Sequence, residues 1–227
     1  MGNELLFLLQ IFLVLGFCFA AVRLGQSALI ALIALQGVVA NLFVVKQMQL
    51  FGLTVTCSDV FAIGSMIGLN LLQEYFGKEQ AQRAIKISFL ALVFFAAVSQ
   101  IHLGYAPAAV DETHGAFHLV LSSTPRIIFA SIATYYLVQK CDIWLFAKLK
   151  KFIGDKYLGV RIGISLVATQ GIDTVLFSFL GLYGLVAEIG SVIFLSFFVK
   201  CLVIGAGAPL STFAKQFLPK RSDELSL

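Results

Sequence analysis

The strongest constraint on the fold is a series of long apolar segments with little polar sequence between them. A bilayer core needs about 20 apolar residues per helix, and its lack of water admits only helices or closed barrels. The sequence therefore predicts an all-α fold, a polytopic integral membrane helical bundle of about seven transmembrane helices. The expected spans are residues 4–22, 28–48, 54–74, 84–105, 125–146, 161–183 and 187–212.

Composition agrees with this fold and argues against an attached soluble module. Of the 227 residues, 59% are hydrophobic and 12% are charged, whereas a soluble domain has about 25% charged residues. We therefore expect one transmembrane domain over residues 1–227, with the lipid bilayer around it. The net charge of +4 is interpreted as a topology signal, so no nucleic-acid partner is expected.

Basic residues gather in alternate connections between the expected spans. The remaining connections hold the acids Asp111, Glu112 and Glu188. By the positive-inside rule, the N-terminus should lie outside and the C-terminus in the cytoplasm. The basic positions include an expected loop from Lys148 to Arg161, and the full set is Arg23, Lys78, Arg83, Lys86, Lys148, Lys150, Lys151, Lys156, Arg161, Lys215, Lys220 and Arg221.

A repeated polar motif lies inside two consecutive apolar runs. Both Leu137–Phe146 and Ala168–Phe177 contain Gln-x-x-Asp-x-x-Leu-Phe. Residues three apart share a helix face, so Gln139 with Asp142, and Gln170 with Asp173, each place an amide beside a carboxylate. A carboxylate at the centre of a span costs roughly 2.5–3.5 kcal/mol on insertion scales. The motif therefore predicts a polar site for a small hydrogen-bonding solute.

The two carboxylates are expected to differ in their surroundings. Asp173 and Lys200 both fall near mid-span, where an ion pair between them would be structural or part of a solute or proton route. Asp142 falls near the cytoplasmic end of its run, where a solvated position is an alternative. Asn41, Glu74 and Arg126 are further candidates. Glu74 and Arg126 lie nearer span ends, where long side chains can reach the interface.

The available chemistry favours a planar heterocycle. A carboxylate accepts paired N–H donors, and a carboxamide both donates and accepts. This set suits an amidine-like edge such as that of guanine better than a fatty acid or a bare ion. Aromatic side chains in the same spans could stack on such a ring or pack against lipid: Phe129, Tyr135, Tyr136, Phe177 and Tyr183.

Motifs typical of enzymes and metal sites are missing from the sequence. It contains no HExxH, no GxSxG and no Walker loop, so no catalytic residue, metal or cofactor is expected. His114 and His118 are four apart near two acids, but no third ligand is fixed by spacing, which favours a surface loop over a metal site.

Several segments together resemble the queuosine precursor transporter family, formerly grouped as putative vitamin uptake transporters. The resemblance runs from about Gln36 to Phe217 and rests on the twice-repeated Arg…Gln-x-x-Asp…Phe pattern. Asn70 stands where many members have Asp. The matching pieces are Asn41, Leu72–Ala84, Arg126–Phe146, Arg161–Phe177 and Lys200.

The resemblance implies import of 7-deazaguanine precursors of queuosine, for use in tRNA modification, across the cytoplasmic (inner) membrane. It divides the chain into an additional N-terminal span (1–25), a family core (26–217) and a cytoplasmic tail (218–227). The implied substrates are 7-cyano-7-deazaguanine, 7-aminomethyl-7-deazaguanine or queuine, bound by Asp173, Gln170, Asp142, Gln139, Asn41, Lys200, Arg126 and Glu74. Two alternatives stay open, a substrate-capture subunit of an ATP-driven vitamin-type uptake complex and a structural protein, as does a homo-oligomeric state.

Overall fold

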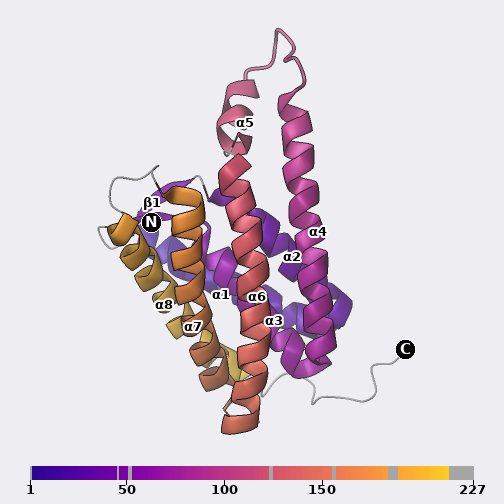
Figure 1. Ribbon diagram of the computed structural model, residues 1–227, viewed down its shortest axis with the longest axis vertical. Helices are drawn as coiled ribbons and strands as arrows, with labels where there is room; N and C mark the ends of the chain where they lie inside the picture. The colour runs from indigo at the N-terminus through magenta and orange to yellow at the C-terminus, as the bar shows by residue number, and fades with distance from the viewer. Residues whose placement is uncertain are drawn as a thin grey trace.

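The protein folds into an all-α helical bundle with one small β-hairpin, which confirms the predicted fold class (Figure 1). The computed structural model describes residues 2–44, 46–50, 53–122, 125–154, 157–183 and 189–214. The elements, in order, are α1 (Asn3–Leu24), α2 (Gln26–Phe43), β1 (Gln47–Leu50), β2 (Leu53–Thr56), α3 (Asp59–Phe76), α4 (Lys78–Leu103), α5 (His114–Leu121), α6 (Pro125–Ile153), α7 (Leu158–Phe177), a π-helical turn (Ser178–Leu182) and α8 (Ile189–Ala214).

Helix α3 is the central element of the bundle. It packs against α1, α2, α4, α6, α7 and α8, and 14 of its 18 residues are buried. Small residues permit this close approach. A Cβ placed on Gly64 would collide with Gln36 of α2 and Val14 of α1, and one on Gly68 would lie 3.0 Å from Ile33. These glycines therefore form a helix-packing face of α3.

The hairpin β1–β2 is a feature that the apolar pattern did not predict. The expected spans over residues 28–48 and 54–74 were too long, because α2 ends at Phe43 and α3 begins at Asp59. The strands pair antiparallel in the register Gln47 with Thr56 and Leu50 with Leu53. Alternating Leu, Val and Thr residues in the second strand favour extended structure over helix.

The two ends of the bundle are distinct. The hairpin, the start of α1 and α5 lie at one end, here called the hairpin end (Figure 1), where the Asn3 side chain donates to the Gln49 carbonyl at 2.8 Å. The turns after α3 and α6 lie at the opposite end, here called the Gly77 end. Each of these turns uses a glycine at positive φ, Gly77 at 93° and Gly154 at 79°, a conformation that costs glycine little.

The expected basic loop from Lys148 to Arg161 is largely helical, so that prediction is wrong. Helix α6 continues to Ile153 and α7 begins at Leu158. Lysines are good helix formers, and in the last turn they offset the negative end of the helix dipole. An apolar run ends at its first charged residues, but the helix that contains the run can continue beyond them.

The outer faces of the helices are apolar. Large side chains such as Phe12 (58% exposed), Leu90 (68%) and Phe94 (67%) point away from the bundle, as expected for surfaces that contact lipid rather than water. By length and composition, four helical stretches among the described residues can cross a membrane: Asn3–Leu24, Gln26–Phe43, Lys78–Leu103 and Leu158–Gly181. The count of seven crossings stays a prediction.

Candidate substrate site

Helix α7 carries a polar contact at almost every turn. Its first turn contains Arg161, bonded to α3, and one turn later Ser165 is bonded to α6. Gln170 and Asp173 follow toward the hairpin end, the latter bonded to α8. These side chains span about 18 Å along the helix at 1.5 Å per residue. The buried polar groups of the bundle therefore lie in three levels along α7.

The middle level is built around Asp142. This carboxyl is 0% exposed and accepts a 2.5 Å hydrogen bond from the Ser165 hydroxyl. Asn70 of α3 and Thr169 of α7 also face it. The alternative that Asp142 is solvated is wrong, because α6 continues for about three turns beyond it and α3 and α7 cover it.

The middle level also contains polar atoms that have no hydrogen-bond partner. They include Oδ2 of Asp142, both amide atoms of Asn70, both amide atoms of Gln139 and Oε1 of Gln170. Asn70 and Gln139 are 0% exposed, and Gln170 is 2% exposed. Buried polar groups are normally bonded. A set of them without partners in one region indicates a site that a polar ligand or water completes.

The hairpin-end level contains the predicted ion pair. Lys200 Nζ lies 2.5 Å from Asp173 Oδ2 and 3.2 Å from the Thr174 hydroxyl. Asp59, at the start of α3, is buried and close enough to interact electrostatically with both charges. The expected order of burial is reversed, since the Asp173 side chain is 23% exposed and Asp142 has no exposure.

The Gly77-end level joins three helices through one carboxylate. Glu74 of α3 receives two 3.0 Å hydrogen bonds from Arg161 of α7 and one of 3.1 Å from Lys150 of α6. Arg161 is 0% exposed and its guanidinium lies 5.2 Å from the Phe146 ring centroid. Glu74 is 7% exposed, so it is buried in an ion-pair network.

The predicted site residues thus do not form one cluster. Asn41 accepts from the Ser131 hydroxyl at 2.8 Å, and Ser131 precedes Asp142 on α6 by about 16 Å of helix. Arg126 begins α6, but its side chain lies outside the described part of the structure. The structure brings Gln139 and Asp142 together in the middle level and separates Asn41, Glu74 and the Asp173–Lys200 pair from them.

Most of the aromatic stacking candidates face away from the interior. Phe129 is 75% exposed, Tyr183 61% and Tyr136 41%, so these rings are wrong as stacking partners for an interior ligand. The hydroxyl of Tyr135, by contrast, has no partner and lies near Gln139, Ser65 and Ser88.

Some residues of the middle level were not among the predicted site residues. Ser165 and Thr169 carry no charge, so their presence in an apolar run does not by itself indicate a site. Their spacing does indicate one, because positions four and eight after Arg161 share its helix face. Asn70 was noted only as a departure from a family pattern, although it is 0% exposed beside Asp142.

His114 and His118 lie on α5, which has no buried residue. Their ring centroids are 6.3 Å apart. The described residues contain no group of three or more His, Cys, Asp or Glu side chains that could hold a metal ion.

Two comparisons with known proteins identify the family of the chain. The family model described as "Putative vitamin uptake transporter" matches residues 56–214, which include all three levels. The chain is 30% identical over 207 residues to a protein of Bacillus subtilis (strain 168) named "Probable queuosine precursor transporter", with 89% of each chain covered. No solved structure matches. The chain is therefore a multi-pass membrane transporter and belongs to the queuosine precursor transporter family, described by its model as putative vitamin uptake transporters.

Proposed function

We propose that the protein imports a 7-deazaguanine precursor of queuosine and that the middle level around Asp142 is its binding site. The observation that carries this proposal is a fully buried carboxylate with one unbonded oxygen, faced by the Asn70 amide, which also lacks partners. The name of the Bacillus relative supports the substrate class.

The chemistry of the middle level matches the edge of the base. A guanine-like ring presents a ring N–H and an exocyclic amine side by side, and a carboxylate can accept both. Charge-assisted hydrogen bonds of this kind are about twice as strong as neutral ones. Asp142 would take this edge, while Gln139 and Gln170 would donate to the carbonyl and accept from the pyrrole N–H.

Asp142 is a better first contact for the base than Asp173, because it is buried without a cationic partner. Asp173 already has a cationic partner in Lys200 at 2.5 Å, so its charge is compensated without a ligand. Asp142 Oδ1 accepts from the Ser165 hydroxyl, whereas its Oδ2 has no hydrogen-bond partner, and an uncompensated carboxylate in a dry interior is costly. Donors from the base would compensate it.

The two flanking ion-pair levels suit alternating access. The Asp173–Lys200 pair joins α7 to α8 on the hairpin side, and Glu74 joins α3 to α6 and α7 on the other side. In transporters of this kind, helices rock around a central site. In this proposal each network closes one side and opens in turn. The protein lies in the cytoplasmic membrane with the hairpin end and N-terminus outside and the C-terminus in the cytoplasm, as the basic residues favour.

Uptake of labelled 7-cyano-7-deazaguanine tests this function in cells that lack precursor synthesis. Cells expressing the wild-type chain alone should accumulate label in tRNA, and Asp142→Asn should abolish uptake at an unchanged membrane level. Asp111→Asn, in the exposed loop after α4, is the matched control and should transport normally.

Normal uptake by the Asp142 variant would contradict the proposed site. Failure of the wild-type chain to transport until an ATP-hydrolysing partner is supplied would instead favour a substrate-capture subunit.

A further inference from the structure

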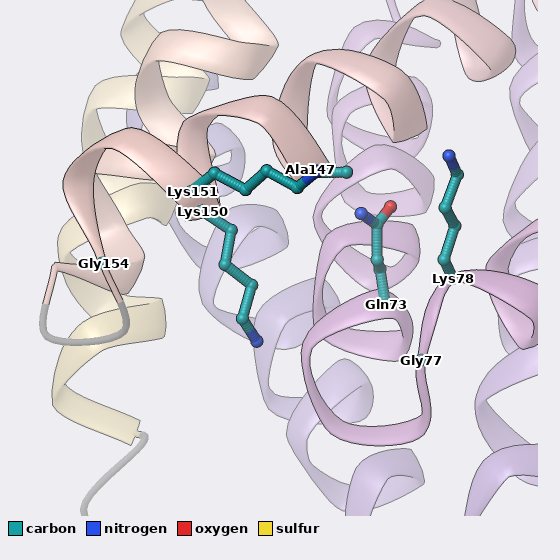
Figure 2. A pocket seen from close by; sticks show the side chains of 7 residues that line it. All are labelled: Gln73, Gly77, Lys78, Ala147, Lys150, Lys151 and Gly154. Atoms are coloured by element: carbon teal, nitrogen blue, oxygen red, sulfur yellow. The ribbon is translucent and has the colours of Figure 1, made fainter.

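A hollow of about 360 Å³ lies at the Gly77 end, and its lining residue Gln73 is about one helical turn along α3 from Asn70 of the middle level. It is formed by the end of α3, the start of α4 and the last turns of α6, and is lined by three lysines, by Gln73 and by small residues (Figure 2). A Cβ placed on Gly77 or Gly154 would meet no atom within 4 Å. Both glycines therefore face open space, and the volume of the hollow is in the range of about 300–1,000 Å³ found for ligand pockets.

The charge of the hollow is positive. Lys78 comes from α4, and Lys150 and Lys151 come from α6. The adjacent carboxylate of Glu74 pairs with both Arg161 and Lys150, so the positive charge left for a ligand is that of Lys78 and Lys151. None of the described residues forms an ion pair with Lys78 or Lys151. The lysines of α6 offset the negative end of the dipole of their own helix. Lys78 instead begins α4, where the helix dipole is already positive, so it adds to the positive charge there.

Two further groups complete an anion site with a polar neighbour. Helix α4 begins at the hollow without a side-chain cap, so its first N–H groups can bind an anion. Gln73 is 8% exposed and lines the hollow; its Nε2 donates to the Ile143 carbonyl at 3.2 Å, while Oε1 has no partner. Figure 2 shows this amide projecting into the space between Lys78 and Ala147. Oε1 can accept from a ligand hydroxyl.

The surroundings place the hollow at the level of lipid headgroups. Phe152, in the last turn of α6, is 85% exposed, and Trp144 is 54% exposed with Lys148 Nζ 3.9 Å from its ring centroid. Exposed aromatic rings beside lysines are typical of the membrane interface, where basic pockets between helices bind anionic headgroups.

We propose that this hollow binds the headgroup of phosphatidylglycerol. Its phosphodiester would accept from Lys78, Lys151 and the start of α4, and a glycerol hydroxyl would donate to Oε1 of Gln73. The lipid would thereby hold α4 against α6 at one end of the bundle. Lipid binding at this hollow can be tested without substrate and without transport.

Native mass spectrometry of the purified full-length protein can measure binding of phosphatidylglycerol, phosphatidylmethanol and phosphatidylcholine in detergent. Phosphatidylglycerol should bind most tightly, and the double variant Lys78→Gln/Lys151→Gln should weaken it about 25-fold, at about fivefold for each lysine near the headgroup. Lys148→Gln is the matched control, because it removes a charge from the same helix outside the hollow, and it should change affinity less than twofold.

Three results would overturn the proposal. An equal loss in Lys148→Gln would mean general surface attraction, and equal binding of phosphatidylmethanol would remove the hydroxyl contact assigned to Gln73. Displacement of the lipid by millimolar glycerol phosphate would assign the hollow to a soluble phosphate. A double variant that unfolds is replaced by the single variants, each of which should show the fivefold loss.

Discussion

Removal of either partner of the buried Glu74–Arg161 contact should destabilise the protein far more than replacement of both. The two 3.0 Å hydrogen bonds join side chains that are 7% and 0% exposed. Breaking such a pair costs roughly 3–5 kcal/mol, because the remaining charge stays buried, whereas an apolar replacement of both is nearly neutral. Arg161→Met should be the milder single variant, since Glu74 keeps Lys150 at 3.1 Å.

Thermal unfolding of the purified protein in detergent measures the loss of stability in the single and double variants. Each single variant, Glu74→Leu or Arg161→Met, should lower Tm by about 10 °C for a chain of this size, and the double variant should recover most of that loss. Lys140→Gln is the control; Lys140 Nζ lies 5.6 Å from the centroid of the exposed Tyr136 ring, and Tm should not change. A double variant whose loss equals the sum of the singles would refute the reasoning.

Three other perturbations follow from the same structure. Gly64→Val should destabilise the protein by roughly 1–3 kcal/mol through overpacking, measured as a lower Tm; an unchanged Tm would mean that α3 does not pack as described. Asp173→Asn should abolish uptake of the labelled base while membrane expression stays normal, and Asp173→Asn/Lys200→Met should restore Tm without uptake; full uptake by the single variant would remove Asp173 from the transport route. A cysteine at Glu112 should react with an impermeant maleimide in intact cells, and one at Lys151 only after lysis; the reverse pattern would invert the proposed orientation.

The apolar pattern was sufficient for the fold class but not for the helix ends. Hydrophobic runs predict where a chain enters lipid, and these predictions hold for α1, α4 and α7. For α3, the run over residues 54–74 predicted a helix but not its central place, because an interior position admits Asn70, Gln73 and Glu74 as readily as leucine. A helix surrounded by other helices meets no lipid, so its sequence has no apolar stripe that identifies its place.

The polar side chains of the candidate site could be selected from the sequence, but their arrangement could not. Gln139, Asp142 and Gln170 were selected because a carboxylate and amides are rare inside apolar runs. The pairing of buried charges was harder to predict. Arg161 follows a group of lysines in the sequence and contacts Glu74 only because α3 packs on α7. Partners that are 87 positions apart are joined by tertiary structure alone.

The central claim is that Asp142 recognises the amidine-like edge of the base, and a binding cycle over residue and ligand tests it most directly. Calorimetry would compare 7-cyano-7-deazaguanine with its analogue that lacks the exocyclic amine, on wild-type protein and on Asp142→Asn. Wild-type protein should prefer the amine-bearing base by about tenfold or more, as expected for loss of one charge-assisted hydrogen bond of about 1.5–3 kcal/mol, and the variant should bind both weakly and alike. An undiminished preference for the amine in Asp142→Asn would contradict the account.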